Sequence, residues 1–179
     1  QHHVTTKENQ VDWAILPGRG ITSWNERGPE VPELSAVELG RGRSGDRLWD
    51  SAQTGRVRHG TMNNNGRMTW GKAFAGWRED AEEAMHLALE MNDRFALDGS
   101  DPRSIAGVQW CFGLFDRAFG PVDPIMGKVR KRPTSVHENR IDMSAYEELT
   151  NKATMGTSMD IAIVGGGLSG MFAARLLSD

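Results

Sequence analysis

The chain has 179 residues, 38% of them hydrophobic and 25% charged, which is typical of a folded domain and excludes a disordered chain. Its single cysteine, Cys111, excludes an internal disulfide and a cysteine-based metal cage, so we predict no metal site and a reducing, cytoplasmic compartment. No apolar run approaches the roughly 20 residues of a membrane span, and the net charge of −3 excludes a uniformly basic surface. Because the sequence begins with Gln1, we expect it to begin inside a longer reading frame or after processing.

Residues 1–45 are rich in glycine, proline and glutamate and show no sustained hydrophobic period, so we predict a loop-rich segment. At most one short helix is expected, around Pro32–Leu39, where Ser35 and Glu38 have the spacing of a capping box. A longer helix is expected after Asp46. Its apolar face is predicted to contain Leu48, Trp49, Ala52 and Val57.

Three aromatic residues then recur at helical spacing. Trp70, Phe74 and Trp77 stand at i, i+4 and i+7, which places them on one face of a helix. In most helices with such a stripe the aromatic residues simply fill a core, so this spacing alone does not predict a functional site. A polar turn at residues 63–66 precedes them.

The next helix is predicted to begin at Asp80, because Asp80 and Glu83 place acidic groups in its first turn. Its inward stripe would consist of apolar residues, namely Ala81, Met85, Ala88 and Phe95. Asn92 falls on the same stripe. A buried amide without partners costs about 1–3 kcal/mol, so Asn92 either bonds to the backbone or is reserved for a ligand.

A turn at residues 97–102 separates this helix from the next one. Pro102 suits the first position of a helix, and Asp101 would cap an almost entirely apolar, buried helix over residues 103–115. A proline-containing loop, a basic extended strap at residues 127–133 and a weak helix at Met143–Leu149 follow. We therefore divide the chain into a loop-rich segment (1–45), a helical domain (46–142), a linker (143–158) and a final unit (159–179).

The final unit has the pattern of a strand, a glycine-rich turn and a helix. The turn glycines, Gly165, Gly167 and Gly170, would let a pyrophosphate approach a helix N-terminus. The segment resembles the start of FAD-dependent amine-oxidase-like or renalase-like oxidoreductases. Because the chain ends nine residues after Gly170, we expect a truncated Rossmann-type β-α unit, joined to the preceding domain at a reading-frame junction.

Five blocks between residues 46 and 132 share their order and near-spacing with one known family: LWDSAQ, RMTWGKAFAGW, LALEMNDRFALDGSDP, GVQWCFGLFDRAFG and GKVR. They resemble the C-terminal, FAD-binding domain of the DNA photolyase/cryptochrome family, and within it the class II cyclobutane pyrimidine dimer photolyase-like bacterial proteins. The resemblance implies a mainly α fold. It also implies FAD as the cofactor and light-driven electron transfer from reduced flavin to a flipped-out pyrimidine dimer.

The resemblance implies a role for each matching residue. Arg67, Asn92 and Asp98 would surround the flavin ring, with Asp98 holding Arg67 by a bidentate pair and Asp101 at a further flavin-side or capping position. The residues implied in re-reducing the flavin are Trp70 nearest the ring, then Trp77 and Trp49 in an order left open. The residues implied in binding the lesion or the opened DNA are Met68, Trp110, Asp116, Arg117, Lys128 and Arg130, followed by Lys131 and Arg132 facing phosphate.

Three functions follow from these patterns. The first is the FAD-binding fragment of a photolyase that acts on damaged DNA in its full-length parent. The second is a cryptochrome-like flavin photosensor without repair activity, and the third is a truncated amine-oxidase-like oxidoreductase. The family's antenna domain and the first half of its flavin domain have no counterpart here. We therefore expect self-association, or a missing N-terminal portion, to complete the FAD site.

Overall fold

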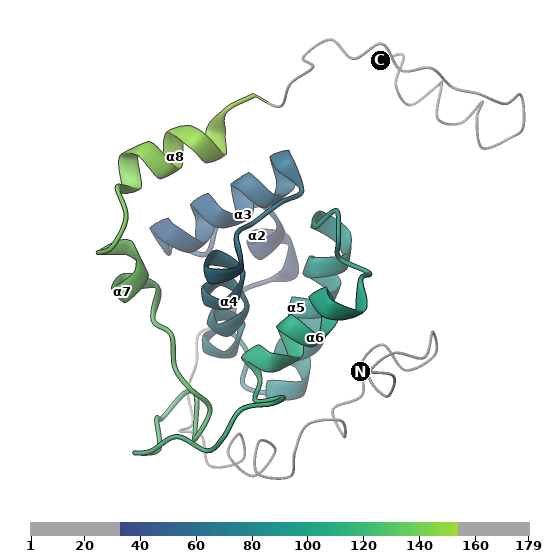
Figure 1. Ribbon diagram of the computed structural model, residues 1–179, viewed down its shortest axis with the longest axis vertical. Coiled ribbons are helices and arrows are strands. Elements are labelled where there is room, and N and C mark those ends of the chain that lie inside the picture. The colour runs from purple at the N-terminus through teal and green to yellow at the C-terminus, as the bar shows by residue number, and fades with distance from the viewer. Residues whose placement is uncertain (1–32, 154–179) are drawn as a thin grey trace, which may run out of the picture.

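The computed structural model describes residues 33–153, and this part of the chain is built from helices (Figure 1). In chain order they are α2 (Ala36–Gly40), α3 (Arg47–His59), α4 (Asn64–Ala73), the 3₁₀ turn η2 (Phe74–Gly76), α5 (Ala81–Phe95), α6 (Pro102–Cys111), α7 (Thr134–Glu138) and α8 (Met143–Asn151). Between residues 33 and 153, β pairing is limited to an isolated bridge between Asp123 and Gly127. The predicted mainly α fold is confirmed for these residues.

Side-chain caps explain where several helices begin. The carboxylate of Asp80 accepts a hydrogen bond from the backbone N–H of Glu83 at 2.8 Å, and Asp101 caps α6 through the N–H of Arg103 at 2.8 Å. Both caps were predicted. The capping box of Ser35 and Glu38 is also present and begins α2. Each cap satisfies a backbone donor that the helix itself leaves unpaired.

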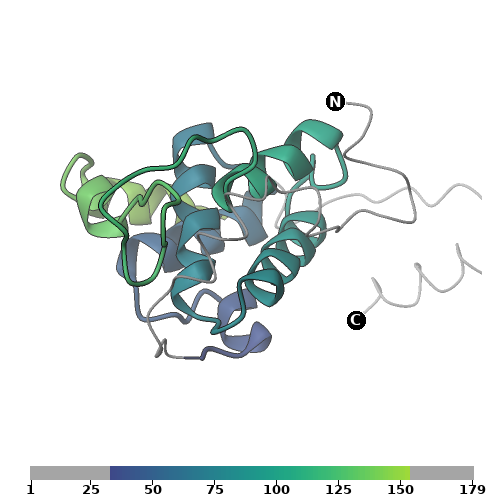
Figure 2. The ribbon, with the colours of Figure 1, turned by 90° about the horizontal axis from the view of Figure 1, so that it is seen from below.

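The helices enclose one aromatic core. α4 contacts α3 on one side and α6 on the other, while α5 packs against α6 and η2, and α8 lies along α3 (Figures 1 and 2). The largest apolar side chains that are completely or almost completely buried are Trp49, Trp70, Phe74, Phe112, Leu39 and Met85. The core therefore lies where α3, α4, η2, α5 and α6 meet.

The buried face of α3 differs from the prediction. Val57 is 50% exposed, whereas Arg56 is 0% exposed. At about 100° per residue, Arg56 lies within about 20° of Trp49 around the helix axis, but Val57 lies about 80° away. A charged side chain thus occupies the inward position, and the apolar one faces the solvent.

The end of α6 also differs from the prediction. The helix stops at Cys111 rather than continuing to residue 115. Gly113 has a φ of 111° and Phe115 has a φ of 65°, so both lie in the left-handed region, where a right-handed helix cannot continue. Phe115 is consequently turned outward and is 60% exposed.

Helix α8 occupies most of the segment that the sequence assigned to a linker, and it packs along α3. Arg47 of α3 forms two hydrogen bonds with the carboxylate of Glu147, at 2.7 and 2.8 Å. Gly55 lies so close to Thr150 that a β-carbon built at Gly55 would be 2.8 Å from the Thr150 Cγ2 atom. Among the described helices, none combines the length and apolar character of a membrane span.

We predict that Gly55→Ala lowers the free energy of unfolding by about 1–3 kcal/mol, because the added methyl group forces α8 away from α3. Thermal unfolding followed by circular dichroism measures this change. Gly107→Ala is the matched control, since a β-carbon at this helical glycine meets no atom within 4 Å. The control should gain up to about 1 kcal/mol from the lower entropy of its unfolded state. A Gly55→Ala protein as stable as the parent would contradict the close packing.

Candidate functional site

An ion pair between α4 and the turn after α5 lies at the centre of the candidate site. Arg67 donates hydrogen bonds from Nη1 to Asp98 Oδ2 at 2.8 Å and from Nη2 to Asp98 Oδ1 at 2.9 Å. This is the bidentate pair that the sequence predicted, and its hydrogen bonds lower the pKa of Asp98 below the usual value. The Arg67 side chain is 15% exposed and that of Asp98 is 50% exposed. The pair thus presents an ionised carboxylate backed by an anchored guanidinium.

Asn92 is fully buried, and protein groups use both of its amide hydrogens. Nδ2 donates to the Gly99 carbonyl oxygen at 3.0 Å and to Ser104 Oγ at 2.9 Å, while Oδ1 accepts from Arg56 Nη2 at 3.0 Å. Ser104 Oγ also accepts a hydrogen bond from Arg67 Nη1 at 2.9 Å. Asn92 is therefore satisfied within the protein. A direct contact with flavin stays a prediction, and a contact through Nδ2 would require one of its two hydrogen bonds to be exchanged.

The three tryptophans predicted from the resemblance form a continuous chain. The rings of Trp70 and Trp49 stack with centroids 6.0 Å apart and planes at 5°, and Trp49 meets Trp77 edge to face at 4.8 Å. Trp49 therefore lies between the other two, which supplies the order that the sequence left open. Trp70 and Trp49 are each 1% exposed, whereas Trp77 is only partly buried. The chain thus leads from the core toward the surface.

Arg56, which the sequence reasoning missed, connects this chain to the Asn92 network. Its guanidinium carbon lies 4.2 Å from the centroid of the Trp70 ring, and its Nη2 binds Asn92. Burial, followed by the nearby charge of Arg67, lowers the pKa of Arg56 to about 10, so the side chain stays protonated at neutral pH. Its helical position relative to Trp49 was the available signal.

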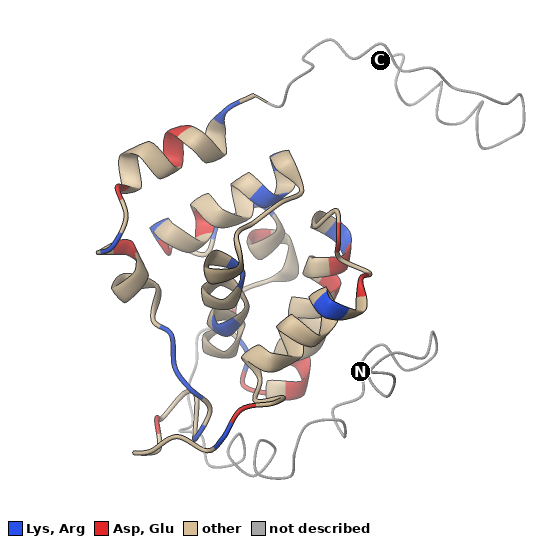
Figure 3. Cartoon of the chain, viewed as in Figure 1, with Lys and Arg blue, Asp and Glu red and all other residues tan. Residues whose placement is uncertain are grey.

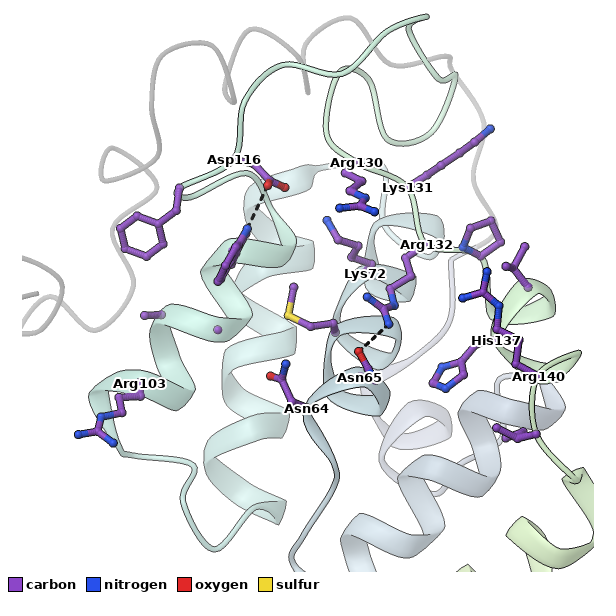
Figure 4. A pocket seen from close by; sticks show the side chains of 18 of the residues that line it. Asn64, Asn65, Lys72, Arg103, Asp116, Arg130, Lys131, Arg132, His137 and Arg140 are labelled. Atoms are coloured by element: carbon purple, nitrogen blue, oxygen red, sulfur yellow. Dashed lines mark hydrogen bonds between the residues drawn. The ribbon is translucent and has the colours of Figure 1, made fainter.

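A cavity of about 1180 Å³ lies between α4, α6 and the basic strap (Figure 4). Met68, Ala106, Gly107 and Trp110 give it an apolar wall, and the indole of Trp110 donates to Asp116 Oδ1 at 3.1 Å. The two residues predicted to touch the lesion, Met68 and Trp110, therefore share this cavity. Its volume slightly exceeds the range of about 300–1000 Å³ common for small-molecule sites.

Lys72 is a second functional candidate that the sequence reasoning missed. It lines the cavity although it is only 6% exposed, and its Nζ donates to the Cys111 carbonyl oxygen at 3.2 Å. Burial lowers its pKa from the usual value. Figure 4 shows Lys72 and Arg130 pointing toward one another in the same part of the cavity. These two cations make that end suitable for an anionic group.

Basic side chains of the strap after residue 127 line the cavity, and some of them also bind other residues of the protein. Arg132 donates from Nε to Thr69 Oγ1 at 2.9 Å and from Nη2 to Asn65 Oδ1 at 3.0 Å. Lys131 pairs with Asp123 at 3.1 Å. Arg132 therefore fastens the strap to α4, and Lys131 supports the preceding loop. Both residues also line the cavity, and their contact with phosphate stays a prediction.

The remaining predicted DNA contacts lie around Phe119. The guanidinium carbons of Arg117 and Arg130 lie 5.1 and 5.8 Å from the centroid of the Phe119 ring. Lys128 is partly buried, and its backbone carbonyl accepts from Phe119 N at 2.8 Å. Arg117 and Arg130 are exposed, and Figure 3 shows basic residues along this strap. Gly165, Gly167 and Gly170 lie outside the described residues.

The residues present partly fit a flavin. Arg67 Nε is buried and has no hydrogen-bond partner in the described part of the chain, so it is a donor without an acceptor. The Arg67–Asp98 pair suits the polar edge of a flat ring, but neither residue lines the cavity beside Met68. Asn92 fits less well, because its amide hydrogens are already used.

Comparison with known proteins identifies relatives with one shared name. A scan against protein-family models found no match. The chain is 42% identical over 102 residues to a deoxyribodipyrimidine photo-lyase of Methanothermobacter thermautotrophicus, covering 57% of this chain and 23% of that protein. It is 34% identical over 147 residues to the deoxyribodipyrimidine photo-lyase of Potorous tridactylus, covering 82% and 27%.

A further deoxyribodipyrimidine photo-lyase, from Oryza sativa subsp. japonica, is 33% identical over 110 residues, covering 61% of this chain and 22% of that protein. The chain thus spans about a quarter of the length of the curated relatives it matches. The shared name of these relatives agrees with the family that the sequence blocks resemble. The chain is similar, over more than half of its length, to deoxyribodipyrimidine photo-lyases, and this similarity supports the resemblance to the DNA photolyase/cryptochrome family.

Proposed function

We propose that this chain is a flavin-binding part of a light-dependent DNA repair enzyme, one that splits cyclobutane pyrimidine dimers. The observation that carries the proposal is a continuous path of contacts from the partly exposed Trp77 to the Arg67–Asp98 pair. It runs through Trp49 and Trp70 to Arg56, and from there through Asn92 and Ser104. A tryptophan chain that ends beside a polar ring-binding edge is suited to supply electrons to a redox cofactor.

FAD is the proposed cofactor, and when bound it would supply the light absorption and the electron for repair. Arg67 would hold a polar edge of the ring, because its Nε still lacks an acceptor among the described residues. Asp98 keeps the Arg67 guanidinium in place through two hydrogen bonds. Asn92 and Ser104 fix the same guanidinium from within the protein.

Damaged DNA is the proposed substrate, and the cavity is its proposed binding site. A dimer within stacked DNA is out of reach of a buried cofactor, so it must be flipped out of the duplex. Met68 and Trp110 offer an apolar wall for two pyrimidine rings, and Lys72 and Arg130 offer positive charge for phosphate. Asp116 holds Trp110 in place through its indole N–H.

The proposed function belongs to a longer protein, since the curated relatives are about four times the matched length. The missing part, or a second copy of the chain, would close the open side of the flavin site. This chain alone should therefore bind FAD weakly. No observation in the described residues favours a photosensor without repair activity or an amine oxidase.

Flavin binding tests the ion pair. We predict that Arg67→Met and Asp98→Asn each weaken FAD binding by about tenfold or more, because each loses charge-assisted hydrogen bonds at the proposed ring edge. Titration of the purified chain with FAD, followed by quenching of flavin fluorescence, measures the affinity.

Glu147→Gln is the matched control for flavin binding, since it removes a carboxylate from another bidentate arginine pair, that of Arg47 between α3 and α8. This control should bind FAD like the parent. No FAD binding by the parent chain, or an equal loss in the control, would overturn the assignment of the ion pair to flavin in this chain.

A substitution at Trp110 tests whether the cavity binds the lesion. We predict that Trp110→Ala lowers the affinity for a single-stranded oligonucleotide containing one cyclobutane dimer by about tenfold, since a base-aromatic stack contributes about 1–3 kcal/mol. Affinity for the undamaged oligonucleotide should change less. Fluorescence anisotropy measures both affinities.

Val37→Ala controls for loss of an exposed apolar side chain, because Val37 is 60% exposed on α2, away from the cavity. This variant should keep the preference for the damaged oligonucleotide. If Trp110→Ala keeps the full preference as well, the cavity is not the lesion site.

A further inference from the structure

The charge of Arg56 is placed asymmetrically along the tryptophan chain. The guanidinium contacts the ring of Trp70, at 4.2 Å from its centroid, and the same geometry is not found with Trp49 or Trp77. Arg56 is 0% exposed, so water does not screen this contact. Its Nε and Nη1 have no hydrogen-bond partner among residues 33–153, so no carboxylate there neutralises the charge at hydrogen-bond distance.

The hydrogen bonds of the two buried indoles determine what happens when either ring is oxidised. Trp70 Nε1 donates to Gln53 Oε1 at 2.9 Å, and Trp49 Nε1 donates to the Trp70 carbonyl oxygen at 3.0 Å. An amide oxygen and a backbone carbonyl are acceptors, but neither is a base at neutral pH. An oxidised Trp70 or Trp49 therefore keeps its N–H proton and carries a full positive charge.

These two features together favour movement of positive charge in one direction along the three tryptophans. A cation close to the ring face stabilises neutral Trp70 by a cation–π interaction and repels the same ring once it is positively charged. Trp49 lies one ring further from Arg56, so the repulsion between Arg56 and an oxidised Trp49 is weaker. Trp77 is only partly buried, so water can accept its indole proton after oxidation.

We propose that Arg56 is a positioning residue that drives the positive charge of an oxidised tryptophan away from Trp70, toward Trp49 and Trp77. Trp70 gives one electron to its acceptor and becomes a radical cation. Trp49 then returns one electron to Trp70, and Trp77 returns one electron to Trp49. Trp77 finally releases its N–H proton to water and remains as a neutral radical.

The proposal rests on the proposed function only for the identity of the acceptor, which would be the flavin. The preference of the positive charge for Trp49 and Trp77 over Trp70 does not depend on the flavin and is a property of the protein alone. Arg56 also holds Asn92 through its Nη2 hydrogen bond, so the two effects must be separated experimentally. Arg56→Gln removes the charge but keeps an N–H donor for Asn92, and Arg56→Lys keeps the charge.

The experiment maps tryptophan oxidation in the chain without flavin. Photogenerated tris(bipyridine)ruthenium(III) removes one electron from an accessible tryptophan, and dioxygen converts the resulting radicals into stable oxygenated products. Peptide mass spectrometry then gives the product yield at each tryptophan. We expect Arg56→Gln to raise the yield at Trp70 relative to Trp77 by about fivefold or more, because the repulsion at Trp70 is gone.

Two variants separate charge from packing. Arg56→Lys should stay within about twofold of the parent, since it retains a cation near the ring. Arg58→Gln removes an exposed arginine two residues along the same helix and should behave like the parent. Near-UV circular dichroism checks the packing of the indoles, and Arg56→Met replaces Arg56→Gln if the latter does not fold.

An unchanged Trp70 yield in the folded neutral variant would overturn the proposal, as would an equal rise in Arg56→Lys, which would point to packing. Because no flavin is present, the outcome is independent of FAD binding. A rise at Trp70 in a chain that fails to bind FAD would support the role of Arg56 and count against the proposed function. FAD binding together with an unchanged oxidation yield at Trp70 would support the proposed function and count against the role of Arg56.

Discussion

A buried guanidinium costs several kcal/mol unless hydrogen bonds and ring contacts offset the loss of water, and Arg56 is buried where α3, α4 and α5 meet. The offset comes from Asn92 of α5, at 3.0 Å, and from the ring of Trp70 on α4, at 4.2 Å. Each contact fixes one neighbouring helix relative to α3. Asn92 also donates a hydrogen bond to Ser104, and Ser104 accepts one from Arg67. The guanidinium that binds the half-exposed Asp98 is therefore anchored in the protein. The site therefore depends on one buried charge.

This charge lies between two regions of the molecule to which the proposed function assigns different roles. On one side are the stacked indoles of Trp70 and Trp49, with neutral hydrogen-bond acceptors and a partly exposed end at Trp77. On the other side are the Arg67–Asp98 pair and the cavity, where an apolar wall meets the buried Lys72. Such a division suits a protein in which electrons arrive through the aromatic core while an anionic ligand binds at the surface.

Local signals were enough to predict the features that depend on neighbouring residues in the sequence. The caps at Asp80 and Asp101 and the inward stripe of α5 follow from spacing alone, and the resemblance supplied the Arg67–Asp98 pair. Arg56 shares the Trp49 face of its helix, but this local signal was not enough to predict a buried arginine. Arginine in a helix usually faces water, and its burial depends on how α4 and α5 pack. The same holds for Lys72. The early end of α6 depends on two left-handed residues, and the place of α8 depends on its close approach to Gly55.

Similarity to the deoxyribodipyrimidine photo-lyases and the order of the tryptophans lead to one central proposal, that the indoles donate electrons to a flavin bound beside Arg67. Transient absorption of the FAD-loaded protein after a blue-light pulse tests this claim most directly. A tryptophan radical should appear in the parent, and Trp70→Phe should remove it while Val37→Ala leaves it unchanged. A parent protein that binds FAD but forms no tryptophan radical, or a Trp70→Phe protein with an undiminished signal, would contradict the account.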